Sequence, residues 1–232
     1  MNNFVVSGCV TNAKLTSKDD KHTCHADFQF FAKDSDEPVI NSKLKAWGKT
    51  AQIIAGLGDK GANLILVASL NVDSNADGSL SLALQVNEVN DAYEGAEIHN
   101  PLNVINLVGR AGRDPEVRYF ESGRVVADFS LAVNRTKDQP PNWFNLEIWG
   151  KQAQVAADYI RKGSLLGVTG KFDVARWTDR SSGEERSKAL IRVDRLELLG
   201  SRRDAESSDG SFGGSAVLRR GGAASQPTTS IF

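Results

Sequence analysis

The hexapeptide Trp47-Gly48-Lys49-Thr50-Ala51-Gln52 returns 102 positions later as Trp149-Gly150-Lys151-Gln152-Ala153-Gln154. Other residues keep nearly the same offset, as Gly8 does with Gly109. A period near one hundred residues is too long for a solenoid repeat and matches the size of one small domain. The sequence therefore predicts two copies of one domain in tandem.

Around the second hexapeptide the hydrophobic period changes. The residues before Trp149 alternate as in a strand, whereas Ala153, Ala156 and Ile160 recur at helical spacing. Lys162-Gly163 predicts the end of this helix, because a cation and a C′ glycine are typical of helix termini. Further alternating segments predict strands at Asn103–Gly109, Val117–Phe120, Val125–Asn134, Trp143–Trp149, Leu165–Trp177 and Ala189–Leu198.

A helix between the third and fourth of five barrel strands is the layout of the OB-fold, a partly open barrel that often binds oligonucleotides. The first copy shows matching strands at Phe4–Val10, Cys24–Ala32, Ser42–Trp47 and Leu64–Val72, and Asp77-Gly78 predicts a tight hairpin. We therefore expect an all-β chain with two five-stranded OB-folds, each with one short helix. The predicted domains are residues 1–95, residues 102–200 and a disordered tail, residues 201–232.

The overall charge of −1 conceals a difference between the two copies. Residues 1–100 hold 8 lysines and no arginine against 13 acidic residues, whereas residues 101–200 hold 16 basic residues, 11 of them arginine, against 13 acidic ones. The planar guanidinium group of arginine pairs with phosphate and stacks on bases. A polyanion should therefore prefer the second copy.

Several short motifs of the second copy occur in one order. They are Asn106-Leu107-Val108-Gly109-Arg110, Asp114-Pro115-Glu116-Val117-Arg118-Tyr119, Trp149-Gly150-Lys151, Tyr159-Ile160-Arg161-Lys162-Gly163-Ser164 and Arg176-Trp177-Thr178-Asp179. Because of these motifs and their order, the chain from Asn103 to Leu199 resembles the bacterial single-stranded DNA-binding protein family. The resemblance implies a sequence-independent binder that protects and organises single-stranded DNA in replication, recombination and repair.

In that family, aromatic side chains on the barrel surface stack on bases. The resemblance assigns this role to Trp143, Trp149 and Trp177, and the repeat adds Trp47; a fourth family position corresponds to Lys137. Stacking contributes about 1–3 kcal/mol per base and tolerates any base. The alternative is that these large aromatic side chains are buried in the core.

Phosphate neutralisation would accompany stacking and make the affinity fall with rising salt concentration. The candidate cations of the second copy are Arg110, Arg113, Arg118, Arg124, Lys151, Arg161, Lys162 and Arg176. The first copy has Asn41 and Asn75 near the positions of Trp143 and Trp177, and it lacks arginine. We therefore interpret it as a degenerate binder with a role in assembly.

The family commonly assembles four OB-folds, so the resemblance and the repeat together imply a homodimer, with a homotetramer as the alternative. Its members usually end in an acidic tip with a final Pro-Phe that recruits replication and repair enzymes. Here the tail ends Thr229-Ser230-Ile231-Phe232 without acidic residues, so recruitment of such partners stays open. Arg219-Arg220 offers a nonspecific nucleic-acid contact instead.

Cofactors, metals and catalysis are not expected. Strand alternation sends Cys24 toward the core and His25 away from it, which argues against a zinc site, and Gly109-Arg110-Ala111-Gly112 lacks the third glycine and the helix of a dinucleotide site. No nucleophile elbow or phosphate loop is present, so an enzyme is not predicted. With no membrane segment and only two cysteines, we expect a cytoplasmic, nucleoid-associated protein. An RNA-binding or replication-restart module and a structural assembly protein are the alternatives.

Overall fold

The computed structural model describes residues 1–31, 38–58, 61–74, 80–93, 101–135, 139–178, 183 and 185–200. The first half contains β1 (Asn2–Lys18), β2 (Lys21–Phe31), β3 (Pro38–Trp47), α1 (Gly48–Gly58), β4 (Asn63–Ser74) and β5 (Leu80–Tyr93). The second half contains β6 (Asn103–Ala111), β7 (Glu116–Tyr119), β8 (Val125–Val133), β9 (Asn142–Trp149), α2 (Lys151–Tyr159), β10 (Leu165–Thr178) and β11 (Glu185–Leu198).

Each half closes into a five-stranded barrel. In the first half β1 pairs with β2, β2 with β3, β3 with β5, β5 with β4, and β4 again with β1. In the second half the same circuit runs through β6, β8, β9, β11 and β10, and β7 adds a short hairpin to β8. The predicted all-β class with OB-type barrels is confirmed. Successive side chains of a strand point to opposite sides, so the alternating apolar residues give each of the two barrels a buried interior.

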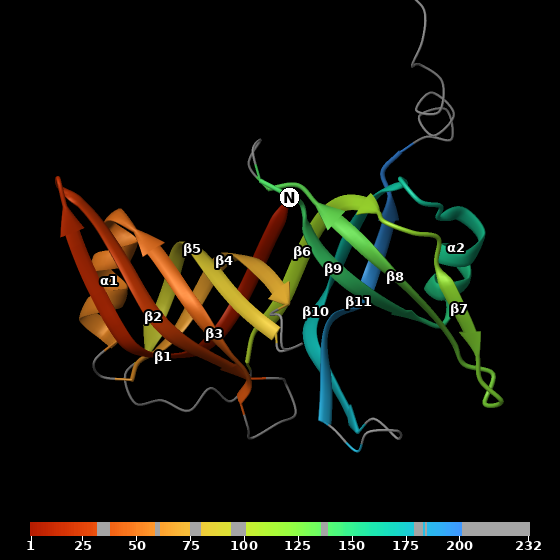
Figure 1. Cartoon of the computed structure of the whole chain (residues 1–232), viewed down its shortest axis with the longest axis horizontal. Coiled ribbons are helices and arrows are strands. Elements are labelled where there is room, and N and C mark those ends of the chain that lie inside the picture. Colours follow the sequence, from red (N-terminus) through yellow and green to blue (C-terminus); the bar gives the residue numbers. More distant parts are fainter. Residues whose placement is uncertain are drawn as a thin grey trace, which may run out of the picture.

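Each helix begins within one of the two hexapeptides, and α1 and α2 lie at opposite outer ends of the molecule (Figure 1). The predicted end of the second helix at Lys162-Gly163 is wrong, because α2 ends at Tyr159. Ile160 has extended backbone angles and is fully buried. The Arg161 guanidinium donates to the carbonyls of Ala157 at 2.9 Å and Ile160 at 2.6 Å. Burial of Ile160 thus turns the chain into the core before the glycine is reached.

The two barrels are joined by direct pairing of β1 with β6. Asn2 to Val6 lie antiparallel to Leu107 to Asn103, and the amide of Val108 donates to the carbonyl of Met1 at 2.9 Å. The N-terminus therefore lies between the two barrels, beside β6 (Figure 1). This pairing makes one continuous 11-stranded sheet from two barrels.

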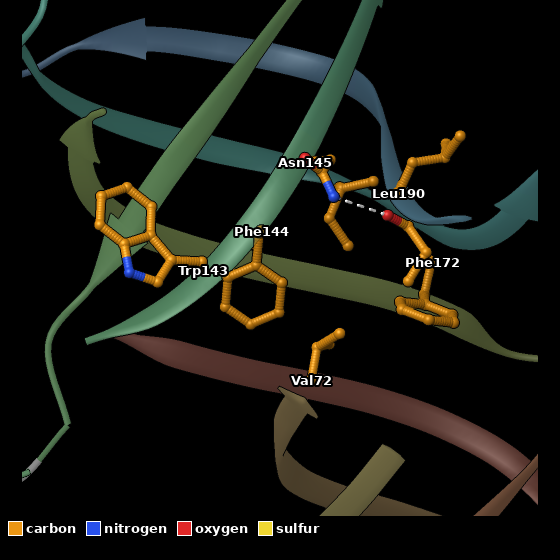
Figure 2. Close-up of a pocket in the computed structure, with 8 residues that line it drawn as sticks. Val72, Trp143, Phe144, Asn145, Phe172 and Leu190 are labelled. Atoms are coloured by element: carbon orange, nitrogen blue, oxygen red, sulfur yellow. Dashed lines mark hydrogen bonds between the residues drawn. The ribbon is translucent and has the colours of Figure 1, made fainter. Parts of the chain in front are cut away.

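Aromatic packing extends the core across this joint. The ring of Phe172 in β10 lies 6.3 Å from that of Phe4 and 5.9 Å from that of Phe30, both in the first barrel. Next to it, Val72 of β4 faces Phe144 and Phe172 across a pocket of about 10 Å³ (Figure 2). A cavity this small leaves the two halves in close contact.

Two buried asparagine side chains form hydrogen bonds with backbone groups of other strands. Asn103 begins β6 opposite Val6, and its side chain donates to the carbonyl of Phe172 at 2.8 Å and accepts from the amide of Phe172 at 2.9 Å. Asn142 donates to the carbonyl of Leu70 at 2.6 Å, so that the start of β9 is bonded to the end of β4. Both side chains satisfy polar groups that water does not reach.

Replacing Asn103 with alanine (N103A) is expected to lower the free energy of unfolding by about 1–3 kcal/mol, because the amide and carbonyl of Phe172 lose their partners in a buried place. Urea unfolding followed by circular dichroism measures this. The exposed neighbour Val104 serves as the control, since V104A removes no hydrogen-bonding group. Equal stability of N103A and V104A would contradict the assignment.

Some predictions fall outside the described residues: the Asp77-Gly78 hairpin, Asn75, Lys137, the side chain of Arg176 and the tail 201–232. The domain boundaries at 95, 102 and 200 and the tandem origin of the halves stay predictions. Within the described part of the chain, neither helix is long and apolar enough to cross a bilayer.

Candidate nucleic-acid interface

All four tryptophans lie at the surface. Their exposed fractions are 50% for Trp143, 38% for Trp149, 46% for Trp177 and 46% for Trp47. The alternative interpretation, that these rings fill the core, is wrong for each of them. Tryptophan is normally buried to a large extent, so four rings with this much free surface need an explanation other than packing.

Trp143 is held at the surface by a glycine. It lies in β9 opposite Ala132, and its ring rests against the backbone of Gly112. A Cβ atom at Gly112 would lie 2.4 Å from Cζ3 of Trp143 and 2.6 Å from the hydroxyl oxygen of Ser130. Any larger residue at 112 would push the ring away, so this glycine sets the position of the indole.

Trp149 belongs to a stacked cluster with Phe120 and Arg124. The rings of Phe120 and Trp149 lie 5.8 Å apart with an angle of 17° between their planes. The Arg124 guanidinium lies 5.8 Å from the Phe120 ring centre and 5.6 Å from that of Trp149. The indole N–H donates to the Glu147 carboxylate at 2.7 Å. These contacts fix the ring in one orientation while leaving part of it exposed.

A shallow depression of about 710 Å³ adjoins Trp149. Arg124, Trp149, Lys151 and Gln154 line it, together with Gly123, Val125, Gly150, Val155 and Asp158, whereas Phe120 does not. The Phe120 ring therefore does not border the depression, although it stacks on Trp149. This arrangement leaves an open space bordered by an aromatic ring, two cations and the carboxylate of Asp158.

Trp177 is carried by an arm rather than by the barrel wall. β10 and β11 remain paired as far as Thr178 and Glu185, beyond the last residues of β10 that pair with β6, and Trp177 lies opposite Arg186. Trp47 ends β3 in the first barrel, with the ammonium nitrogen of Lys45 5.3 Å from its ring centre. The four predicted rings are thus distributed over both barrels and the arm.

The predicted phosphate contacts divide into two groups. Arg113 pairs with Glu116, Arg118 with Asp128, and Arg110 donates to the carbonyl of Gly163 at 2.9 Å. The Arg161 guanidinium donates to the carbonyls at the end of α2. The bond from Lys162 to Asp114, at 2.7 Å, uses the backbone amide of Lys162 and not its ammonium group. Arg124 and Lys151 instead border the depression beside Trp149. Exposed ion pairs contribute about 0–1 kcal/mol, so Arg113 and Arg118 can exchange a carboxylate for a phosphate at small cost.

Phe120 is the residue that the sequence interpretation missed. The sequence pattern assigned it only to a short strand, but it follows β7 at the start of a turn. In this turn the amide of Phe120 donates to the carbonyl of Arg124, and the amide of Gly123 donates to the carbonyl of Phe120. Gly123 has a φ of 75°, which favours glycine there. The Glu121-Ser122-Gly123 turn was visible in the sequence; the contact with Trp149 was not, because the two residues are 29 positions apart.

Replacing Phe120 with alanine (F120A) is expected to weaken oligo(dT) binding about two- to tenfold, because Trp149 loses the ring that holds it. Fluorescence titration at one salt concentration measures this. Tyr119 is the matched control, since it is an exposed aromatic side chain of the same hairpin without a ring partner among the described residues. Equal affinities of F120A and Y119A would show that the stack does not position Trp149.

Within the described part of the chain, the histidines and cysteines do not converge on one site. Cys24 is fully buried beside Ala26 and Phe28, whereas His25 is exposed, as alternation predicted. Burial raises the pKa of both the Cys9 and Cys24 thiols. Both thiols are therefore protonated at neutral pH, and a protonated thiol is a poor nucleophile.

Comparison with known proteins agrees with this surface. The model of the "Single-strand binding protein family" matches residues 102–199. Single-stranded DNA-binding protein 1 of Synechocystis is 61% identical over 106 residues, which cover 44% of this chain and 88% of that protein. The chain belongs to the single-strand binding protein family. A relative from Thermosynechococcus vestitus, also named a single-stranded DNA-binding protein, is 60% identical over 106 residues, covering 45% of this chain and 88% of that protein. The relatives are thus binding proteins by name, and none of these names describes an enzyme.

A likeness in fold extends beyond the second barrel. The crystal structure of the wild-type single-stranded DNA binding protein from Thermus aquaticus matches with a TM-score of 0.60 and 20% identity. The match covers 87% of this chain and 94% of that one. The arrangement of both barrels, and not only of the second, therefore has a counterpart among solved structures.

Proposed function

We propose that this family member binds single-stranded DNA without sequence preference and protects and organises it in replication, recombination and repair. The observation that carries the proposal is the exposure of three tryptophans, Trp143, Trp149 and Trp177, on the barrel and arm of the half that matches the family. Every base has a flat π-face, so exposed rings bind any sequence.

The mechanism is stacking combined with neutralisation of phosphates. Gly112 holds the Trp143 ring at the surface, and Phe120 and Arg124 hold that of Trp149. A base on the free surface of Trp149 would lie in the depression, where Arg124 and Lys151 would meet its phosphates. Since the rings are ordered before DNA arrives, little conformational entropy is lost on binding.

Assembly is the second part of the proposal. Two barrels per chain and a family that commonly uses four suggest a homodimer, and a homotetramer is the alternative. The same role implies action in the cytoplasm at the nucleoid. Recruitment of replication and repair proteins by Phe232 stays open, because Thr229 and Ser230 stand where the family pattern has acidic residues and proline.

The test is a titration of the full chain with a long oligo(dT) at two salt concentrations, monitored by tryptophan fluorescence. Strong quenching and an affinity that falls with salt are the expected results. A matched oligo(U) titration distinguishes DNA from RNA, because only RNA has the 2′-hydroxyl. Absence of quenching and binding at low salt would overturn the proposal and favour a structural assembly protein.

A further inference from the structure

The side chain of Asn142 connects the second barrel to the first. Asn142 begins β9 and is 1% exposed. Its amide nitrogen donates to the carbonyl of Leu70 at 2.6 Å, and its oxygen accepts from the amide of Val72 at 3.3 Å. Both partners belong to β4 of the first barrel. The first residue of β9 is therefore held by a strand of the other barrel.

The chain that leads from β8 into β9 is bonded to β4 at a second residue. β8 ends at Val133, and Arg135 follows shortly after it. The Arg135 guanidinium donates to the side-chain oxygen of Asn142 at 3.3 Å and lies 3.6 Å from the Asp73 carboxylate of β4. Because Asp73 is exposed, its ion pair with Arg135 adds little stability. Of the two links to β4, the buried one through Asn142 is therefore the stronger.

Trp143, the residue after Asn142, is a proposed stacking platform. Successive side chains of a strand point to opposite sides, so burial of Asn142 turns Trp143 outward, where it is half exposed. The ring rests against Gly112 of its own barrel, and Trp143 lines the same small pocket as Val72 of the first barrel (Figure 2). Trp143 thus lies at the joint between the barrels, next to the residue that bonds to β4.

Trp149 differs from Trp143 in this respect. The side chains that hold its ring all belong to the second barrel: Phe120, Arg124 and Glu147. A change at the contact between β4 and β9 should therefore move the ring of Trp143 and leave that of Trp149 in place.

We propose that Asn142 is a positioning residue for strand binding, through which the first barrel holds the Trp143 ring in the orientation that stacks on a base. The inference rests on the proposed function, because it requires Trp143 to contact bases. A ring that is held in place before the ligand arrives loses less conformational entropy on binding. Strand binding by the second barrel therefore depends on its contact with the first barrel, through a residue that itself touches no base.

The experiment is a double-mutant cycle in the full-length protein, with Asn142→Ala, Trp143→Ala and the variant that carries both. Anisotropy of a labelled long oligo(dT) gives the affinities. N142A should weaken binding about three- to tenfold, which is part of what one stacked base contributes. In the W143A background N142A should have no further effect, because the ring that Asn142 positions is gone. The slope of log affinity against log salt should stay at the wild-type value, because no phosphate contact is lost.

Fluorine NMR of the protein labelled with 5-fluorotryptophan reports on the ring itself. The chain has 4 tryptophans, and the resonance of Trp143 is assigned by its absence in W143A. N142A should shift or broaden this resonance and leave those of Trp47, Trp149 and Trp177 unchanged. A general loss of stability would not single out one ring.

Asn103→Ala is the matched control. Asn103 is also buried, and its side chain also donates to one carbonyl and accepts from one amide, but both belong to Phe172 of its own barrel. N103A should therefore lose stability and keep its affinity for oligo(dT).

Val72→Ala is a second variant, which tests the joint without removing a buried polar group. Val72 is half-buried in the first barrel and has neither a charge nor a ring, so V72A should fold normally. It should weaken binding about two- to fivefold where Trp143 is present and have no effect in the W143A background.

Equal losses of affinity in N142A and N103A would overturn the inference, because stability alone would then explain both. An effect of N142A that persists in the W143A background, or a lower salt slope, would also refute it. So would wild-type affinity of V72A together with an unchanged Trp143 resonance in N142A. Failure of the wild type to bind oligo(dT) at low salt would instead overturn the proposed function.

Discussion

Alanine at both Trp143 and Trp177 (W143A/W177A) is expected to lower the affinity for a long oligo(dT) by about 30-fold or more. Both rings are about half exposed and neither is needed to fill the core, so folding should be preserved. Each base that loses its stacking partner loses about 1–3 kcal/mol. Two such losses multiply in the dissociation constant, since about 1.4 kcal/mol is tenfold.

Fluorescence anisotropy of a labelled oligo(dT) measures this effect, because the variant lacks two of the four tryptophans whose quenching would otherwise report binding. Tyr159→Ala is the matched control, since Tyr159 is a large exposed aromatic side chain on α2 outside the proposed surface. An affinity of the double variant within twofold of the wild type, with an unchanged thermal unfolding curve, would remove stacking from the mechanism.

The largest effect on stability is expected at the joint between the barrels. Replacing Phe172 with alanine (F172A) should lower the free energy of unfolding by about 3–5 kcal/mol, because a buried ring is lost and the surrounding side chains refill the space only in part. The ring lies against Phe4 and Phe30, so the loss also loosens the contact between the halves.

Urea unfolding gives the change in stability, and hydrogen exchange locates it. The amides of Asn2 to Val6 should exchange faster in F172A, since their strand pairs with β6 beside the missing ring. Lys171→Ala is the control, because this exposed neighbour in β10 points away from the core. A loss below about 1 kcal/mol, or faster exchange in the second barrel alone, would show that the halves are not coupled through Phe172.

Local patterns predicted the elements well because strand alternation and helical spacing depend on neighbours in the chain. The strand at Trp143–Trp149 and the exposure of Trp143 follow from that alternation, with Phe144 and Leu146 on the buried side. The end of α2 was missed because it depends on burial of Ile160, which only the finished core determines. Phe120 was missed for the same reason, since its partner Trp149 is brought to it by the pairing of β8 with β9.

The sequence by itself determined two barrels of one design, the rings on the second barrel and the family to which the chain belongs. The repeated Trp-Gly-Lys motif and the spacing of apolar residues in each segment are local features of the chain, so they do not depend on how the barrels are arranged. Only the tertiary structure decided that β1 pairs with β6 and that Phe172 packs against the first barrel. The reason is that strand register, which brings together residues far apart in the chain, is set by the whole core and not by any one segment.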